Sequence, residues 1–391
     1  MRNWKDCILA DLGEIIGGAT PSTTNKNYYG GDIVWITPKD LSTLQGRFIH
    51  HGMRNITREG LNSCSARLMP KHSILFTSRA PIGYVAITGN EVCTNQGFKS
   101  IIPNANIDYL FLYYLLVHNR NRIENMGSGT TFKEVSGSVM KDITVSVPSD
   151  IAEQRIIARI LGALDDKIEN NTAINNHLEQ IAQAIFKSWF VDFEPFGGKM
   201  PKDWREGILS DIATVMMGQS PAGTTFNTDG IGTVFYQGRA EFGFRFPSRR
   251  LFTTQSKRMA MKGDVLVSIR APVGDLNVAF EPCCLGRGLA AIQSNNCQSF
   301  TLYTMFVLKR VLNIYNGEGT VFGSINKDDM MNLPILIPSS QILQRFEVLV
   351  NPIDAAIETN YVENCHLQNL RDALLPRLMS GEIDVSHLKT D

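Results

Sequence analysis

The sequence lacks any apolar run of the length that a membrane span requires. A helix that crosses a bilayer needs roughly 18 consecutive apolar residues, and the longest candidate, Tyr109–Val117, is far shorter. The N-terminal residues carry charges with no apolar segment behind them, so no secretory signal is evident. We therefore expect a cytoplasmic protein with no membrane partner.

The sequence also lacks the cysteine and histidine spacings that are typical of metal sites. Its seven cysteines, at positions 7, 64, 93, 283, 284, 297 and 365, contain no Cys-x-x-Cys pair, which favours reduced thiols without a metal. His50 and His51 form the only histidine pair, and no nearby His or Glu completes the spacing of a zinc site. We expect no bound metal.

Nucleotide-binding and catalytic motifs are missing as well. The only Gly-Lys pair, Gly198-Lys199, is followed by Met200 rather than Ser or Thr, which excludes a recognisable Walker loop. The segment Asn332–Ile335 (NLPI) lacks the second proline and the aromatic residue with which amino-methyltransferases hold a flipped base. The sequence favours a non-catalytic chain with no cofactor of its own.

Net charge is absent, but charge is unevenly distributed. Lys+Arg and Asp+Glu each number 38. Residues 1–148 and 198–338 each hold 15 basic and 11 acidic residues, a net of +4, whereas residues 149–197 and 339–391 each hold 4 and 8, a net of −4. The basic segments suit a phosphate-bearing partner, and the acidic ones suit a protein. The neutral total predicts weak DNA affinity for the isolated chain.

What the sequence does contain is a repeat that divides it in two. The run Leu75–Gly83 (LFTSRAPIG) returns 191 positions later as Leu266–Gly274 (LVSIRAPVG). Two further runs recur at nearly the same distance, Gly127–Phe132 as Gly317–Phe322 and Leu164–Asn171 as Ile353–Asn360. A period near 190 residues is too long for a solenoid repeat, so each copy is a whole domain with its connector.

Each basic segment has the pattern of a mixed α/β domain, in which short β-branched or apolar runs alternate with Gly, Pro, Asn and Thr. The strands expected in the first copy are Asp32–Thr37, Ser73–Ser78, Tyr84–Thr88, Phe98–Ile102 and Ile143–Val147. Those expected in the second are Gly232–Gln237, Asp264–Ile269, Leu276–Phe280, Leu289–Gln293 and Leu333–Ile337. One longer helix is expected in each copy, at Ile107–Asn125 and Gln298–Tyr315.

The acidic segments have the pattern of long helices. From Ile151 to Phe190 the only Gly or Pro is Gly162, and apolar residues recur at steps of three and four. Such spacing forms a heptad stripe. The stripe residues are Ile157, Leu161, Leu164, Ile168, Leu178, Ile185 and Trp189 in the first connector, and Phe346, Val350, Ile353, Ile357, Leu367, Leu374 and Leu378 in the second. A helix of about 35 residues is about 50 Å long.

Asparagines interrupt both stripes at matching positions, Asn171 and Asn175 in the first connector and Asn360 and Asn364 in the second. A buried asparagine in such a stripe costs stability but fixes the register of a helix pair. We therefore expect the two helices to form an antiparallel coiled coil within one chain, which separates the two α/β domains and gives the repeat pseudo-two-fold symmetry. Packing of each helix on its own domain alone is the alternative.

Several strings together resemble the specificity subunit of a Type I restriction–modification enzyme, over the whole chain and in the order of that family. They are Ser78–Gly83 (SRAPIG), Asn95–Gly97 (NQG), Glu153–Arg155 (EQR), Leu164–Asn171 (LDDKIENN) and Leu375–Ile383 (LPRLMSGEI). The second copy departs from the pattern at Leu285–Gly288 (LGRG), where the first has NQG.

The resemblance implies a non-catalytic subunit that binds double-stranded DNA and recognises a bipartite sequence. Its parts would be a first target-recognition domain (1–148), a central conserved helix (149–197), a second target-recognition domain (198–338) and a C-terminal conserved helix (339–391). It also implies two methyltransferase subunits docked on the helices and restriction subunits in the full complex. S-adenosylmethionine, ATP and Mg²⁺ would be bound by those partners.

Candidate DNA-contacting residues fall into two classes. Arg79 and Arg270 occur in both copies, after a predicted strand and before a Pro-x-Gly turn, so phosphate contact or a structural ion pair suits them better than base choice. Base-contacting residues are expected in loops where the copies differ, because Gln suits adenine and Arg or Lys suits guanine. These are Lys39, Gln96, Lys99 and Thr130 in the first copy and Gln237, Arg239, Arg287 and Thr320 in the second, with the Gly-flanked segments Thr20–Thr24 and Ser220–Thr225 beside them. Variable surface loops without a role in binding are the alternative.

Two other functions are compatible with the sequence. One is a scaffold whose helix pair carries two adaptor domains that do not bind DNA, and the other is a self-contained DNA-modifying enzyme. Salt-sensitive, sequence-selective DNA binding with a methyltransferase partner would distinguish the first. Methyl transfer by the purified chain would distinguish the second.

Overall fold

The computed structural model describes residues 4–79, 81–129, 133–317 and 323–388. The chain forms two compact units, Met1–Ala173 with Asn360–Asp391, and Ile174–Thr359. Each unit contains one globular copy and a part of both long helices. Among the described residues, no helix has the length and apolar character needed to cross a membrane.

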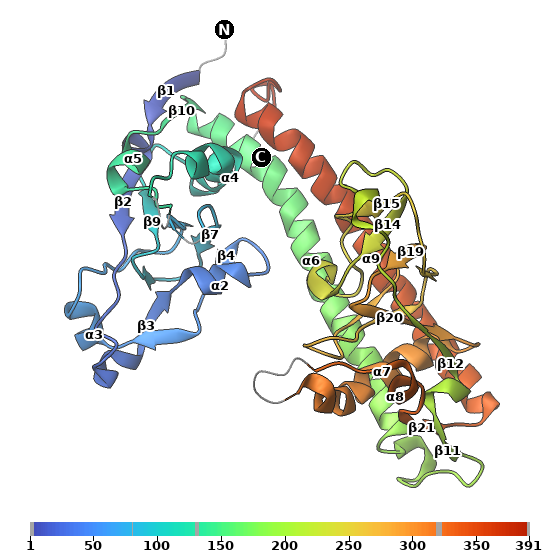
Figure 1. The fold of residues 1–391 in the computed structure, drawn as a ribbon. Coiled ribbons are helices and arrows are strands. Elements are labelled where there is room, and N and C mark those ends of the chain that lie inside the picture. The colour runs from blue at the N-terminus through green and yellow to red at the C-terminus, as the bar shows by residue number, and fades with distance from the viewer. Residues whose placement is uncertain (1–3, 80, 130–132, 318–322, 389–391) are drawn as a thin grey trace. The chain divides into compact units, whose positions relative to one another are not determined.

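Three sheets form the globular copy of the first unit (Figure 1). An antiparallel pair joins β1 (Trp4–Ile8) and β10 (Thr144–Pro148). A five-stranded sheet has the order β2 (Gly13–Gly17), β9 (Lys99–Pro103), β6 (Ile74–Phe76), β7 (Val85–Thr88) and β4 (Phe48–Ile49). A three-stranded sheet has the order β5 (Arg54–Ile56), β3 (Tyr29–Ile36) and β8 (Cys93–Thr94).

Short helices complete this copy. They are α1 (Leu9–Leu12), the 3₁₀ turn η1 (Lys26–Tyr28), α2 (Pro38–Ser42), α3 (Arg58–Asn62), α4 (Tyr109–Asn125) and α5 (Gly137–Lys141). The longest, α4, begins at Tyr109 because the carboxylate of Asp108 accepts hydrogen bonds from the backbone N–H groups of Leu110 and Phe111. Its buried side chains share one hydrophobic core with the sheet and with both long helices of this unit, including Phe111, Leu161 and Leu378.

The globular copy of the second unit repeats this plan. The antiparallel pair is β11 (Arg205–Ile208) with β21 (Pro334–Ile337). A four-stranded sheet has the order β12 (Ala213–Met217), β20 (Leu289–Ser294), β17 (Val265–Ser268) and β18 (Leu276–Val278). A five-stranded sheet has the order β13 (Phe226–Asn227), β15 (Phe252–Thr253), β14 (Thr233–Tyr236), β19 (Cys283–Leu285) and β16 (Met259–Ala260).

The helices of the second copy are α7 (Gln298–Leu312) and α8 (Lys327–Met331). Its 3₁₀ turns are η3 (Leu209–Asp211), η4 (Gly223–Thr225), η5 (Arg239–Glu241) and η6 (Asn313–Asn316), and η2 (Glu194–Phe196) follows the first long helix. The order β2-β9-β6-β7 in one copy corresponds to β12-β20-β17-β18 in the other, and β3 with β8 is parallel just as β14 with β19 is. The internal repeat predicted from the sequence is confirmed in strand order and direction.

The two connectors are continuous helices of 40 residues each, α6 (Ile151–Phe190) and α9 (Ser340–Met379). In the first unit, Asp165 of α6 pairs with Arg371 of α9 at 2.7 Å, and Lys167 pairs with Glu363 at 3.2 Å. Residue numbers rise on one helix as they fall on the other, so the helices pack antiparallel there.

In the second unit the same direction holds. The side-chain amide of Asn175 on α6 donates to the carbonyl oxygen of Ile357 on α9 at 3.1 Å. One turn along, Arg245 bridges Glu179 of α6 and Asp354 of α9, at 3.1 and 3.2 Å. Figure 1 shows α6 and α9 side by side within each unit. The predicted antiparallel pair is confirmed, and because α6 also packs on the core of its own globule, the two packing modes coexist.

All ten expected strands overlap observed ones, with ends displaced by a few residues. The helix expected at Gln298–Tyr315 ends earlier, at Leu312, and the chain continues as η6. Eleven observed strands had no predicted counterpart, namely β1, β2, β4, β5, β8, β11, β12, β13, β15, β16 and β19. Most of them are only two or three residues long, too short to show a period, and β1 reads WKDCI, with two adjacent charged residues exposed.

Candidate nucleic-acid interface

Lys39 lies in a helix rather than in the predicted loop. The backbone N–H and the hydroxyl of Thr37 both donate to Oδ2 of Asp40, at 2.7 and 2.6 Å, which caps the N-terminus of α2. Pro38 stands in the first turn, where a missing N–H costs no hydrogen bond. The Lys39 side chain is exposed on this turn, so it is accessible although its backbone differs from the prediction.

The equivalent segment of the second unit is also helical. Arg239 begins η5 instead of lying in a loop, and its guanidinium pairs with Asp275, which also contacts Lys309 at 3.2 Å. Gln237 is exposed two residues earlier. The carboxylate of Asp275 therefore offsets part of the charge of Arg239, whereas the amide of Gln237 stands on the surface.

A glycine-containing turn lies beside α2 in the first unit. Gln96 is exposed in this turn, and its side-chain oxygen accepts a hydrogen bond from the hydroxyl of Thr20. A Cβ atom on Gly97 would lie 2.9 Å from Cγ of Pro38, so glycine is needed for the turn to approach α2. The structure thus brings three predicted segments together.

The second unit has the same juxtaposition. Arg287 is exposed in the turn before β20, and its backbone N–H donates to the hydroxyl of Ser220 at 3.2 Å. A Cβ atom on Gly288 would lie 2.9 Å from the carbonyl oxygen of Gln237. Gln237 and Arg287 are therefore neighbours, as Lys39 and Gln96 lie on neighbouring segments of the first copy.

The repeated arginine has different surroundings in the two copies. Arg79 is half-buried, and its guanidinium lies 4.0 Å from Glu134, which also pairs with Lys99 at 3.3 Å. Lys99 lies in strand β9, as the strand expected at Phe98–Ile102 places it, and not in a loop as its grouping with the loop candidates implies, and its side chain is only 17% exposed. These three residues carry a net charge of +1.

In the second copy Arg270 is exposed and makes no ion pair within the described residues. Ser324 forms with Arg270 the same β-bridge that Glu134 forms with Arg79. Ala290 takes the position of Lys99, because it follows Arg287 by three residues as Lys99 follows Gln96. Among the described residues, neither the carboxylate nor the lysine has a counterpart beside Arg270, so the charge that these residues place there is again +1. The two remaining predicted residues, Thr130 and Thr320, lie outside the described residues.

The asparagines of the helix pair are tied to each other in the first unit. The amide of Asn171 is buried and donates to Glu363 at 2.8 Å and to Asn364 at 2.9 Å. Asn364 in turn donates to the hydroxyl of Thr172 at 3.3 Å. Asn360, also in the first unit, lies half-buried on α9, and in the second unit Asn175 is buried on α6.

A buried cluster of Arg47, Tyr114 and Asp165 joins the first globule to its helices. Nη1 of Arg47 donates to the Tyr114 hydroxyl at 3.3 Å, and this hydroxyl donates to Asp165 at 2.6 Å. Nε of Arg47 also pairs with Glu169 at 3.0 Å. Burial would lower the pKa of Arg47, but Glu169 and Tyr114 more than offset it and the pKa is raised. The guanidinium stays charged.

The second unit repeats the cluster with Arg245, Tyr303 and Asp354. Arg245 donates to the Tyr303 hydroxyl at 3.0 Å, and this hydroxyl donates to Asp354 at 2.7 Å. Burial raises the pKa of Tyr303, which keeps the phenol protonated. Burial also raises the pKa of Glu179, which pairs with the same arginine. Each globule is thus fixed to the helices by the same three residue types.

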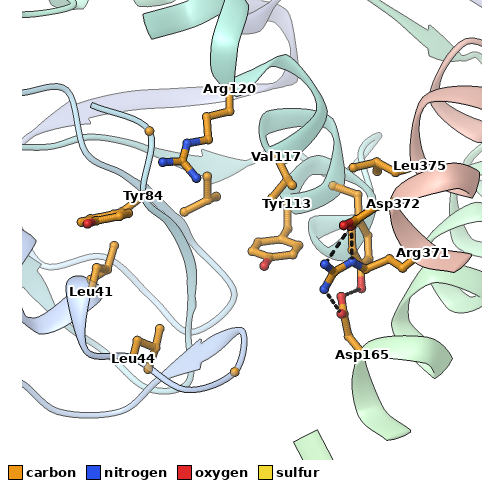
Figure 2. Close-up of a pocket in the computed structure, with 14 residues that line it drawn as sticks. Leu41, Leu44, Tyr84, Tyr113, Val117, Arg120, Asp165, Arg371, Asp372 and Leu375 are labelled. Carbon is orange, nitrogen blue, oxygen red and sulfur yellow. Dashed lines mark hydrogen bonds and ion pairs between the residues drawn. The ribbon is translucent and has the colours of Figure 1, made fainter. Parts of the chain in front are cut away.

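A cavity of about 280 Å³ lies next to the first cluster (Figure 2). Tyr113 and Val117 of α4 line it together with Arg371 of α9, which holds Asp165 and Asp372 through hydrogen bonds of 2.7 and 2.8 Å. The cavity therefore belongs to the junction between globule and helices. Within the described residues, no group of three or more His, Cys, Asp or Glu is arranged to hold a metal.

The two clusters were not predicted from the sequence. A signal does exist, because Arg47-Phe48 and Arg245-Phe246 repeat the same dipeptide and Tyr114 and Tyr303 are separated by nearly the period of the repeat. The arginines lie in otherwise dissimilar strings, however, and their partners are more than 50 residues away. Only the folded chain shows that they meet.

Comparison with known proteins gives one consistent family. The model of the Type I restriction modification DNA specificity domain matches residues 1–180 and 201–361. The MjaIX specificity subunit of Methanocaldococcus jannaschii is 35% identical, over 99% of this chain and 95% of its own length. The HindI specificity subunit of Haemophilus influenzae is 25% identical, over 98% of this chain and 100% of its own.

Among solved structures, the Type I restriction–modification S subunit from M. genitalium has a similar fold. Its TM-score is 0.60 at 17% identity, with 96% of each chain covered. The fold, the repeat and the two long helices of the present chain agree with this likeness. The chain belongs to the specificity subunits of Type I restriction–modification enzymes, the non-catalytic subunits that carry the DNA sequence specificity.

Proposed function

We propose that each globular copy recognises one half of a bipartite target in double-stranded DNA, and that α6 and α9 set the spacing between the halves. The observation that carries this proposal is a repeated framework with divergent exposed residues. The strands that correspond in the two copies follow the same order, β2-β9-β6-β7 in one and β12-β20-β17-β18 in the other. The exposed polar residues differ at corresponding positions, because the first copy has Lys39 and Gln96 where the second has Arg239 and Arg287. A shared fold with different side chains suits two different base sequences.

Two methyltransferase subunits complete the proposed complex by docking on the helices, and restriction subunits join them in the cleaving form. The acidic connectors, each with a net charge of −4, are repelled by DNA and suit protein partners. S-adenosylmethionine binds to the methyltransferase subunits, and ATP with Mg²⁺ binds to the restriction subunits. The assembly works in the cytoplasm, where the DNA of the cell is within its reach.

Mapping of methyladenine tests the proposal. DNA from cells that carry this chain and the methyltransferase of the same system is sequenced with detection of modified adenine. We expect one motif with two defined halves and an unspecified spacer, lost when the gene for this chain is deleted. A scaffold without DNA recognition would leave methylation unchanged by the deletion, and a contiguous motif would contradict the two-reader arrangement.

A further inference from the structure

A basic groove of about 640 Å³ lies in the first globule, beside the segments already described. We propose that it binds the sugar–phosphate backbone of DNA next to the half-site of the first copy, and that the second copy has no equivalent. The inference rests on the proposed DNA recognition. Its lining residues are Thr23, Lys26, Tyr29, Gly30, Gly31, Gly52, Met53, Arg54 and Asn55.

The charge of the groove favours an anion. Lys26 and Arg54 are both exposed, and neither forms an ion pair within the described part of the chain. The lining contains these two cations and no carboxylate. A carboxylate beside a surface cation cancels part of its electrostatic field, whereas the fields of Lys26 and Arg54 add together in one concave site.

The shape of the groove favours a backbone over a base edge. Bases are reached by side chains that protrude into a DNA groove, whereas the sugar–phosphate strand is a ridge that fits a concave surface. Gly30 has a φ of +82°, and apart from its two chain neighbours no residue has an atom within 4 Å of the position that its side chain would take, so the floor is open there. Glycine permits a close approach of two backbones.

The groove is continuous with the segment that carries Lys39. Oδ1 of Asp40, whose other oxygen caps α2, accepts a hydrogen bond from the backbone N–H of Met53 at 2.8 Å. Tyr29 of the groove donates its hydroxyl to the carbonyl oxygen of Pro21 at 2.7 Å, next to the Thr20 that contacts Gln96. A strand of DNA held in the groove would therefore run beside the predicted base-contacting residues.

Backbone pairing identifies the equivalent residues of the second copy. Thr57 donates its backbone N–H to Tyr28 at 3.0 Å, and Thr254 donates to Thr225 at 3.2 Å. Asn55 stands opposite Val34, and Phe252 stands opposite Val234. Counting from these pairs, Lys26 corresponds to Gly223 and Arg54 to Leu251. Both cations are absent from the second copy.

This correspondence supplies variants that the fold already tolerates. The double substitution K26G/R54L gives the groove the residues of the second copy, and K26Q/R54Q keeps polarity while it removes charge. The chain is assembled with the methyltransferase of its system, and its binding to a duplex with the mapped motif and to a scrambled duplex is titrated over a range of salt concentrations. A variant of equal charge, K71A/K141A, changes exposed lysines that do not line the groove.

Each neutralised phosphate adds about 0.9 to the slope of log K against log salt, so both groove variants should lower this slope by about 1 to 2 on both duplexes. The methylated motif and the ratio between the duplexes should stay unchanged, and K71A/K141A should keep the wild-type slope. An unchanged slope in the groove variants, an equal loss in K71A/K141A, or an altered half-site would overturn the proposal. If the groove variants lost slope but the wild type did not prefer its motif over the scrambled duplex, the proposed sequence recognition would be overturned and phosphate binding by the groove would stand.

Discussion

At the scale of single residues, the described neighbours of the repeated arginine give the same local charge in the two copies by different means. Arg79 has Glu134 and Lys99 as neighbours, whereas Arg270 has Ser324 and the position of Lys99 is held by alanine. The first copy thus has a carboxylate and an ammonium group that the described residues of the second copy lack, and the two charges cancel. A net charge of +1 in each place would suit the phosphate contact that we propose for the two arginines, since counterion release depends on charge and not on the side chain that carries it.

This compensation predicts a double-mutant cycle. E134S alone raises the local charge to +2 and should steepen the salt dependence of DNA binding by about 1, because one more phosphate charge is matched. K99A alone should make it shallower by a similar amount. The double variant E134S/K99A should return to the wild-type slope. Additive effects that leave the double variant far from wild type in salt titrations of the assembled complex would contradict the compensation.

We expect the exposed residues that differ between the copies to make the base contacts. Exchanging Lys39 for arginine, or Arg239 for lysine, should change the methylated motif in one half-site and leave the other intact, because the two side chains belong to separate copies. Methylation-site sequencing of cells with each variant measures this directly. An alteration of both halves by either single exchange would show that these residues act on the fold instead.

The buried clusters predict an equal stability loss in the two units. Removing the Tyr114 hydroxyl with Y114F leaves Asp165 and Arg47 each short of a buried hydrogen bond, and a hydrogen bond to a charged group contributes roughly 1.5 to 3 kcal/mol. We expect a loss of this size in urea unfolding, and the same for Y303F. The control is Y113F, because within the described residues the Tyr113 hydroxyl makes no hydrogen bond, and it should change stability by less than about 0.5 kcal/mol.

At the scale of elements, the long helices could be predicted and the site only in part. Ile151 to Phe190 was expected to be helical from its heptad stripe and its near absence of glycine and proline, and α6 has these limits. Lys39 is predicted to lie in a loop because the two copies differ at this segment. The segment is instead helical, because Asp40, three residues after Thr37, caps the N-terminus of α2. Such short helices are determined by one or two hydrogen bonds, which periodicity does not detect.

The helix pair predicts that spacer length follows helix length. Seven residues inserted after Ala173 in α6 and seven after Thr359 in α9 preserve the contacts of Asn171 with Asn364 and of Asn175 with Ile357. They lengthen the pair by about 10 Å with little rotation. The mapped motif should keep both halves and gain up to about three base pairs of spacer. A single insertion in α6 is the control, since it breaks the matching and should abolish methylation.

An unchanged spacer in an active double-insertion complex would contradict this role of the helices.

The asparagine contacts are the part of this arrangement that the sequence predicts in kind but not in detail. It placed Asn171 and Asn364 on polar layers, and the structure adds that Asn171 also contacts Glu363 and that Asn364 contacts Thr172. Side-chain partners between distant segments follow from packing and are not encoded in local periodicity.

At the scale of the whole molecule, the repeat organises charge as well as fold. Each globule carries +4 and each connector −4, so the chain has no net charge. The duplication and the alternation of charge were both visible in the sequence because they are sums over long segments. The groove between η1 and β5 was not, because Lys26 and Arg54 are 28 positions apart and become neighbours only through the pairing of β3 with β5.

The balance of charge predicts that DNA recognition belongs to the complex rather than to this chain alone. Without a net positive charge, the isolated chain should bind duplex DNA no more tightly than ordinary non-specific binding, about 10⁻⁴ to 10⁻⁶ M at physiological salt. With its methyltransferase the affinity for the mapped motif should reach about 10⁻⁸ M or better, because added phosphate contacts hold the duplex while the globules make the base contacts. Fluorescence anisotropy with the motif and a scrambled duplex measures both states. If the isolated chain already discriminated between the duplexes by a thousandfold, as complete specific binders do, the partner would be unnecessary for recognition and the acidic helices would serve assembly alone.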